Sequence, residues 1–176
     1  MNETFEYKGY TFKVEVTPDN FIPWEQFDDT GPVSDWTRRD KRPGEWVLCE
    51  DRHNRQYYDF AEAVKKAKRE GWDAPPYSVG TAGERAVRAV IADFERLRRW
   101  CNDQWVYVCL HVTLLDEFGD ETEYDDALGG VEYDYSNNSW KVDAEEMADV
   151  CLYELECAQK AERIDNRFKD AMECGV

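Results

Sequence analysis

The spacing of hydrophobic and polar residues changes several times along the first hundred residues. Apolar and polar residues alternate over 5–16, with a natural turn at Lys8-Gly9, and apolar runs flank the polar segment 51–54, so two β-hairpins are predicted. Helical spacing then predicts a helix from Asp59 to about Glu70, which Gly71 and the following prolines end. A second helix is predicted from about Thr81 to Trp100, with one apolar stripe formed by Val87, Val90, Ile91, Phe94 and Leu97.

The second half of the chain begins with the strongest strand pattern, at residues 105–115. Both faces of this strand are rich in apolar residues, which favours a central strand covered on each side. A turn containing Gly119, a short acidic strand over 121–125 and a hairpin about Asn137-Asn138 are expected next, and a final helix from near Asp143 to about Met172. The pattern predicts a single α+β domain over residues 1–176, with an antiparallel β-sheet built from hairpins and packed against two or three helices.

Residues 19–43 interrupt this pattern with a long loop. The segment has three prolines and no hydrophobic period, yet it contains four large apolar residues, Phe21, Trp24, Phe27 and Trp36. We therefore expect a loop that is pinned to the body of the protein by these side chains.

Composition limits the class of protein. With 39 acidic and 22 basic side chains, the formal net charge is −17, which disfavours direct binding to nucleic acid or to an anionic membrane. The sequence has no apolar run of membrane-spanning length and no signal-peptide pattern, so a soluble, unsecreted protein is expected. The six cysteines lack short paired spacings and lie in apolar segments, so they are interpreted as buried free thiols.

The negative charge is concentrated in one segment. Residues 103–159 contain 16 acidic side chains and one lysine, whereas residues 1–102 are nearly balanced. Exposed turns and the preference of acidic residues for a helix N-terminus explain part of this. The alternative is a surface whose carboxylates replace nucleic-acid phosphates in a basic groove. That candidate partner-binding surface comprises Asp116, Glu117, Asp120, Glu121, Glu123, Tyr124, Asp125, Asp126, Asp143, Glu145, Glu146 and Asp149.

Charge density tests the second interpretation. From Asp143 to Glu156 a helix rises about 20 Å and carries six carboxylates, whereas B-DNA of that length carries roughly twelve charges. The acids of the preceding hairpin would therefore have to lie alongside the helix. Tyr133 and Tyr135, together with Tyr124, would add aromatic contacts to a partner.

Catalytic and metal-binding motifs are missing from the sequence. The acidic run from Asp116 lacks the EF-hand spacing, and Cys109 with His111 is more simply explained as part of a packed strand than as a zinc or thiol site. The glycines of the segment 80–85 match no phosphate-binding motif and suit a helix start instead. We therefore expect no enzyme activity, no cofactor and no metal, and an unrecognised enzyme remains the third alternative.

The second predicted helix carries a basic stripe opposite its apolar side. Its members are Arg85, Arg88, Arg96 and Arg99. Such a stripe can bind phosphate or an acidic partner, or it can pair with the acidic half of this chain or of a second copy. The second interpretation is favoured, so these arginines are a candidate self-association surface and a homodimer is a further expectation.

Two stretches, GEWVLCEDRHNRQYYDFAEAVKKAKREGWDAPPY and RRWCNDQWVYVCLHVTLLDE, resemble a family of small uncharacterised proteins of tailed bacteriophages and prophages. The resemblance covers about residues 44–133. The C-terminal third lies outside it, and Leu128 to Glu132 depart from the family's tryptophan-containing motif. No catalytic or ligand residue is carried over from this family.

The resemblance implies a phage accessory protein, and small acidic proteins of that kind often inhibit host defence enzymes. We therefore expect a non-enzymatic protein in the host cytoplasm that blocks the basic nucleic-acid site of a CRISPR or restriction complex. Its partner would be a basic host protein or ribonucleoprotein, with no direct binding to nucleic acid or membrane. The alternative is a self-associating structural or regulatory phage protein.

Overall fold

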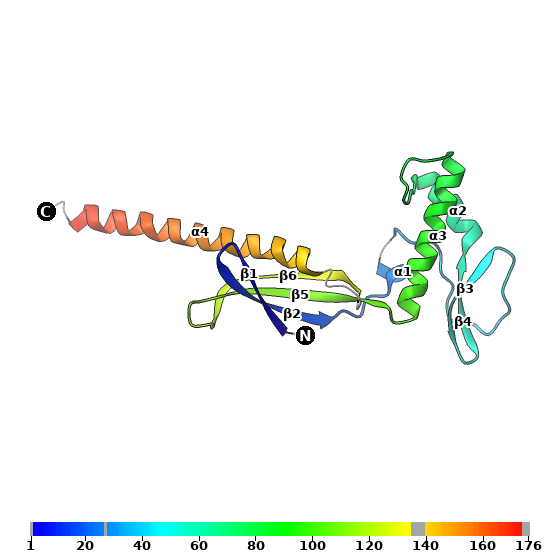
Figure 1. Cartoon of the computed structure of the whole chain (residues 1–176), viewed down its shortest axis with the longest axis horizontal. Coiled ribbons are helices and arrows are strands. Elements are labelled where there is room, and N and C mark those ends of the chain that lie inside the picture. Colours follow the sequence, from blue (N-terminus) through cyan, green and yellow to red (C-terminus); the bar gives the residue numbers. More distant parts are fainter. Residues whose placement is uncertain (1, 27, 135–139, 174–176) are drawn as a thin grey trace. The chain divides into compact units, whose positions relative to one another are not determined.

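The computed structural model describes residues 2–26, 28–134 and 140–173, without the side chains of residues 168, 170, 171 and 173. Its elements in chain order are β1 (Asn2–Tyr7), β2 (Tyr10–Pro18), α1 (Pro23–Gln26), β3 (Glu45–Asp51), β4 (Asn54–Asp59), α2 (Phe60–Glu70), α3 (Ala82–Cys101), β5 (Trp105–Leu115), β6 (Glu121–Asp134) and α4 (Trp140–Glu173) (Figure 1). The predicted α+β class with antiparallel hairpins and packed helices is confirmed.

The chain divides into two compact units. Unit 1 comprises Met1–Asn20 with Tyr107–Val176, and unit 2 comprises Phe21–Val106. Unit 1 has 23 acidic and seven basic side chains, a net charge of −16, whereas unit 2 has 16 and 15, a net charge of −1. The charge asymmetry of the sequence therefore follows the structural division. That residues 1–176 fold as one domain stays a prediction.

Unit 1 is built on a four-stranded sheet in the order β1-β2-β5-β6. The predicted first hairpin is confirmed, because β1 and β2 pair antiparallel around Lys8 and Gly9, whose positive φ angles of 50° and 86° form the turn. β2 then pairs antiparallel with β5. The strand predicted over residues 105–115 is confirmed as an interior strand of the sheet.

One face of this sheet is covered by α4. Val14 on β2 and Val112 on β5 are completely buried there, as are Ala144 and Cys151 on the helix. The Cys151 thiol donates a weak hydrogen bond to the Val112 carbonyl at 3.8 Å. On the opposite face His111 is about 40% exposed, so the expectation that β5 is covered on both sides is wrong at the middle of the strand.

The end of β6 also differs from the prediction. Instead of a short strand that ends before Gly129, β6 continues through Gly130, whose N–H donates to the Asp19 carboxylate at 3.2 Å. The expected hairpin about Asn137-Asn138 is wrong in its second strand, because Trp140 begins α4 and is buried in the core. The predicted turn itself lies outside the described residues.

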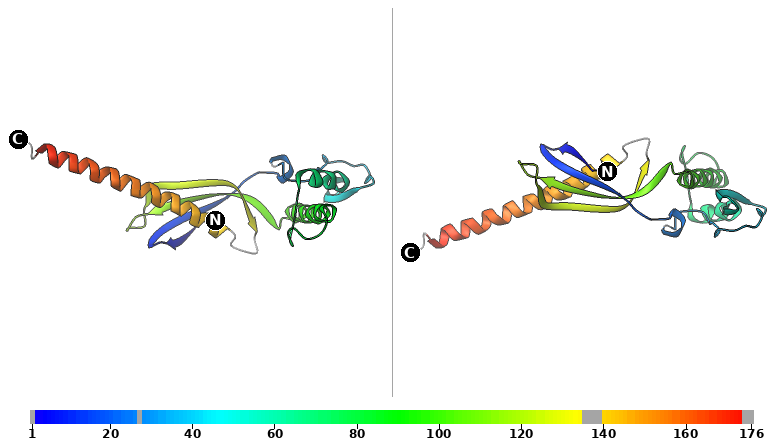
Figure 2. Two further views of the ribbon diagram at one scale, coloured as in Figure 1. Left: turned by 90° about the horizontal axis from the view of Figure 1, so that it is seen from above. Right: turned by 90° about the horizontal axis from the view of Figure 1, so that it is seen from below.

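Unit 2 consists of the predicted β3-β4 hairpin packed against α2 and α3 (Figure 2). The predicted helix ends are confirmed, since Asp59 caps α2 and Gly71 ends it in a left-handed conformation. Thr81 and Glu84 form a reciprocal capping box at the start of α3. This capping box confirms the helix start expected in the segment 80–85.

α3 buries a side that coincides only in part with the one expected. Val90, Phe94 and Leu97 are buried as predicted, but Val87 and Ile91 are each more than one-third exposed. Small residues explain the difference: Ala86 and Ala89 of α3 are buried, as are the alanines at 63 and 67 in α2. Alanines on both helices permit close approach of their backbones, which turns the branched residues outward.

The long loop of unit 2 is pinned in part as expected. Trp24 packs edge-on against Trp100, with ring centroids 5.1 Å apart, but Trp36 is about half exposed. Two isolated backbone bridges tie Val33 and Thr37 of the loop to β4 instead. Phe27 lies outside the described residues.

The interpretation of all cysteines as buried free thiols is wrong. Cys49 on β3 and Cys101 at the end of α3 form a disulfide, with Cα atoms 5.6 Å apart. They are 52 residues apart in the sequence, so a search for short spacings overlooks them. Cys109 is half-buried, Cys151 is buried and Cys157 is exposed. Cys174 lies outside the described residues.

Candidate partner-binding surface

The turn between β5 and β6 is the most prominent feature of the acidic segment. Asp116 orders it: its carboxylate Oδ1 accepts hydrogen bonds from the backbone N–H groups of Phe118 and Asp120, both at 2.9 Å. Two backbone hydrogen bonds, from the Asp116 N–H to the Asp120 carbonyl and from the Gly119 N–H to the Asp116 carbonyl, complete the turn, in which Gly119 has a positive φ. Asp116 therefore acts as a turn-forming residue as well as a surface charge.

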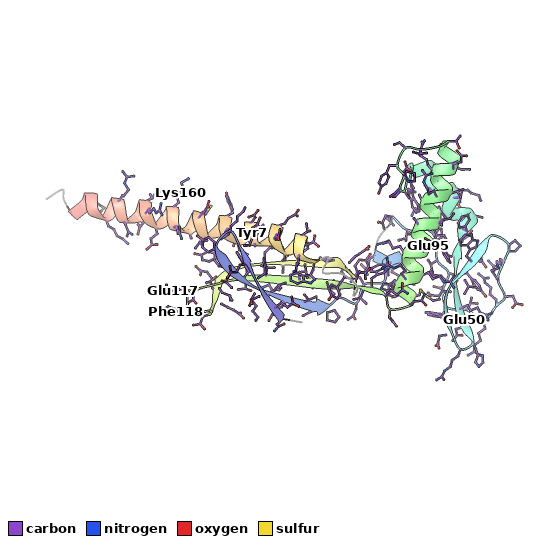
Figure 3. The ribbon with its side chains drawn as sticks, viewed as in Figure 1. Tyr7, Glu50, Glu95, Glu117, Phe118 and Lys160 are labelled. Atoms are coloured by element: carbon purple, nitrogen blue, oxygen red, sulfur yellow. A yellow bond between two sulfur atoms is a disulfide. The ribbon has the colours of Figure 1, made fainter. Side chains whose placement is uncertain are left out.

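Phe118 is at the tip of this turn and is 81% exposed, the largest exposed fraction of any large hydrophobic side chain among the described residues. Figure 3 shows it beside Glu117 at the end of the hairpin. Sequence reasoning missed Phe118, although the signal was present as a single aromatic residue inside the acidic segment DEFGDE. An exposed aromatic ring among carboxylates is a candidate interface anchor.

Next to the β5-β6 turn, unit 1 contains a groove of about 410 Å³, which lies between this turn, the β1-β2 turn and α4. Asp116 and Glu117 contribute acidic groups, and the apolar part of the lining comes from Tyr10, Leu114, Leu115, Tyr124 and Leu155. A groove with an apolar lining and carboxylates suits the aliphatic stem and cationic head of a lysine or arginine side chain.

The acids of β6 that share a face with His111 are already partly compensated. Glu121 accepts a hydrogen bond from Lys13 at 2.5 Å, and Lys13 also lies 2.6 Å from Glu15. Asp125 lies 2.6 Å from His111 Nε2. The bonds to Glu121 and Glu15 raise the pKa of Lys13, and Lys13 lowers the pKa of Glu15. Two of the β6 carboxylates in this row are therefore engaged in contacts within the chain, although a single lysine is shared between Glu121 and Glu15.

The acids of α4 lie on the other side of the sheet. Asp149 is paired with Lys8 at 2.6 Å and accepts a hydrogen bond from the Tyr7 hydroxyl at 3.2 Å. The bond from Lys8 holds the pKa of Asp149 below its usual value. Glu145 and Glu146 are exposed, and Asp143 is half-buried.

The predicted surface is thus divided by the sheet. Asp116 to Asp125 gather at the turn and along the face bearing His111, whereas the four α4 acids lie along the helix that covers the opposite face. Asp126 and Tyr124 are half-buried, and Tyr124 lines the groove beside α4. Burial, followed by the charge of Glu123, raises the pKa of Tyr124. Tyr133 is half-buried, and Tyr135 lies outside the described residues.

The arginines proposed for self-association are less exposed than expected. Arg88 donates to the carbonyls of Ala74, Pro76 and Val79 at 3.0–3.1 Å and to the Asp73 carboxylate at 3.2 Å. Arg85 donates to the Gly80 carbonyl at 2.9 Å. These contacts hold the segment between α2 and α3 in place.

The other two arginines of the stripe differ in exposure. The Arg96 guanidinium lies over the Trp105 ring, 5.2 Å from its centroid, and Arg99 is exposed. Self-association through this stripe stays a prediction.

Neither a metal cluster nor a membrane-spanning helix is found in the part of the chain that the structure describes. Cys109 and His111 contact different groups: the thiol contacts the Leu110 carbonyl and the imidazole contacts Asp125. Burial raises the pKa of the Cys151 thiol to about 11. Such a thiol remains protonated at neutral pH, which makes it a poor nucleophile and metal ligand.

A scan against protein-family models, a search of curated proteins and a search of solved structures each gave no match.

Proposed function

We propose that this chain is a phage-encoded acidic binding protein that occupies the basic nucleic-acid site of a host defence complex of the CRISPR or restriction type. The observation that carries the proposal is the segregation of charge, −16 on unit 1 against −1 on unit 2. Mere solubility does not require the charge to follow a structural boundary. The phage context rests on the sequence resemblance alone.

The β5-β6 turn is the proposed point of contact. Long-range attraction to the acidic unit speeds encounter with a basic partner by roughly 10- to 1000-fold at low salt. At short range, Phe118 enters an apolar site on the partner, while a basic side chain of the partner enters the groove beside Glu117. Charge then governs the association rate and the aromatic anchor governs dissociation.

The contacts that the β6 carboxylates make within the chain argue against a close copy of DNA. Of the acids 121, 123 and 125 on β6, the first and last are already paired with Lys13 and His111. The mechanism is therefore complementary charge with an aromatic anchor.

The test is a pull-down from nuclease-treated bacterial lysate at about 50 mM and about 500 mM salt. The test variant reverses three exposed acids at and next to the turn, Glu117→Lys, Asp120→Lys and Glu123→Lys. A control variant reverses three exposed acids of unit 2, Glu25→Lys, Asp51→Lys and Glu95→Lys, and so changes the net charge equally.

The proposal predicts that the wild type and the control capture the same nucleic-acid-handling complex at low salt, and that the turn variant does not. Equal capture by both variants would contradict a site at the turn. Recovery of only the protein itself or of phage proteins would support the alternative, a self-associating structural or regulatory protein.

A further inference from the structure

α4 extends well beyond the sheet it covers. Its buried residues are near its start, and Cys151 is the last of them. From Glu156 to Arg167 every side chain is exposed, and Figures 1 and 2 show the helix continuing past the strands of unit 1. Helices in water gain most of their stability from packing an apolar face. An exposed extension of this length is therefore expected to pack against a partner.

The exposed part of α4 carries its own apolar stripe, which we call the outer stripe. The members whose side chains are described are Val150, Tyr153, Cys157, Ala161, Ile164 and Met172, and the sequence continues the same spacing at Phe168. Successive members are three, four and four residues apart, an 11-residue repeat that stays on one side of a nearly straight helix. Tyr153 is 68% exposed and Ile164 51%.

The outer stripe is separate from the side of α4 that packs on the sheet. At about 100° per residue, it lies roughly a third of a turn around the helix from Ala144 and Cys151, which are buried against the strands. A second helix can therefore lie along the outer stripe without displacing the sheet. The stripe spans 22 residues, or about 33 Å.

The charges along α4 indicate which partner fits. Residues 143–156 carry six acids and no base, whereas residues 157–173 carry four bases and four acids. A second copy in parallel would place two purely acidic halves side by side. An antiparallel copy places each acidic half against the half that contains the bases, with Glu156 near Arg167 and Glu154 near Lys169 of the second copy.

The charge of the whole unit favours the same orientation. If Ala161 faces Ala161 of the second copy, the two sheet-covered segments centred near residue 148 lie about 40 Å apart along the helix axis. That distance is several times the Debye length of about 8 Å at physiological salt, so the two units of charge −16 hardly repel each other. Ala161 also allows the closest approach of the helices at the midpoint.

We propose that the outer stripe of α4 binds the same stripe of a second copy of this chain, antiparallel, with Ala161 at the two-fold axis. This homodimer does not depend on the arginines of α3. It leaves the β5-β6 turn of each copy free, so it is independent of the proposed inhibitor function.

Disulfide trapping tests the orientation. A variant with Cys157→Ser, Cys174→Ser and Ala161→Cys has a thiol at the proposed axis and should form a covalent dimer under mild oxidation. A variant with only Cys174→Ser keeps Cys157, which faces residues 164–165 of an antiparallel copy and should not cross-link. If Cys157 cross-links as readily as the thiol at residue 161, the pair is parallel and the proposal is overturned. Failure of the thiol at residue 161 to cross-link also overturns the proposal.

Sedimentation equilibrium tests the surface itself. The wild type should dissociate reversibly between twice the chain mass and 20.7 kDa. Ile164→Glu should raise the dimer dissociation constant by roughly 100-fold or more, because a symmetric pair loses the apolar contact twice. The matched control Asn166→Glu adds the same charge on the opposite side of the exposed extension and should leave the constant within a few-fold. A monomeric wild type, or equal effects of the two variants, overturns the proposal.

Discussion

Replacing Gly31 by alanine tests the packing of unit 2 at its tightest point. A Cβ atom at residue 31 would lie 2.2 Å from the Tyr58 hydroxyl oxygen and 2.3 Å from the ring carbon that bears it. Tyr58 is completely buried, and its hydroxyl donates to Asp93 Oδ2 at 2.7 Å. The Gly31 N–H donates to the same oxygen at 2.8 Å. The added methyl group therefore forces the ring or the loop to move.

The cost has two parts. Overpacking a core costs about 1–3 kcal/mol. Movement of the ring or the loop also breaks a hydrogen bond to Asp93, whose pKa burial already raises, and a buried group without its partner costs about 1–3 kcal/mol. Gly31→Ala should thus lower the free energy of unfolding of unit 2 by about 2–6 kcal/mol. At roughly 4–8 °C per kcal/mol for a unit of this size, even the lower end of that range lowers Tm by about 8–16 °C.

Tryptophan fluorescence is the appropriate assay, because six of the seven tryptophans are in unit 2. The control is Gly83→Ala in the first turn of α3, where a Cβ atom would have no neighbour closer than 3.8 Å. This change should leave stability unchanged or raise it by up to about 1 kcal/mol, since alanine favours a helix more than glycine does. Equal Tm values for the two variants would refute the packing argument.

Three further predictions follow from named contacts. Cys49→Ser with Cys101→Ser should lower the Tm of unit 2, because a disulfide that closes a loop of this length contributes about 2–4 kcal/mol. Intact-mass spectrometry should show that the wild type gains two more hydrogens on reduction than this double variant does. Glu45 has a lowered pKa because of its hydrogen bond from Arg39, so it contributes stability above its ordinary pKa of 4.5 that is lost as the pH falls through the folded value. Urea titrations should therefore show that Glu45→Gln destabilises at pH 7 and that the difference shrinks toward pH 3. Phe118→Ala should leave thermal stability unchanged but accelerate dissociation of the captured partner, measured by surface plasmon resonance; an unchanged dissociation rate would exclude Phe118 as the anchor.

Local signals in the sequence predicted most elements. The turn at Lys8-Gly9, the caps at Asp59 and Thr81, and the apolar run of β5 each depend on neighbouring residues, and each is confirmed. The Cys49–Cys101 disulfide depends on how β3 packs beside the end of α3, which no local spacing reveals. The start of α4 at Trp140 was missed for the same reason, because burial in the core outweighs the local hairpin signal.

The candidate surface was predicted in its charge but not in its arrangement. Counting charges located the acidic segment, and the structure keeps that charge on one unit. The pairing of Lys13 with Glu121 and of Lys8 with Asp149 joins residues more than 100 positions apart, so the sequence could not show which acids are compensated. The exposure of Phe118 likewise depends on the turn geometry that Asp116 fixes.

Competition with nucleic acid tests the central claim most directly. The complex captured from lysate is incubated with fluorescent duplex DNA or RNA of the kind it binds, and the anisotropy is followed as the acidic protein is added at about 150 mM salt. The proposed mechanism predicts complete displacement of the nucleic acid by the wild type, and displacement by the Glu117, Asp120 and Glu123 reversal variant only at a far higher concentration. A ternary complex that keeps the nucleic acid bound at saturating protein would contradict occupation of the nucleic-acid site.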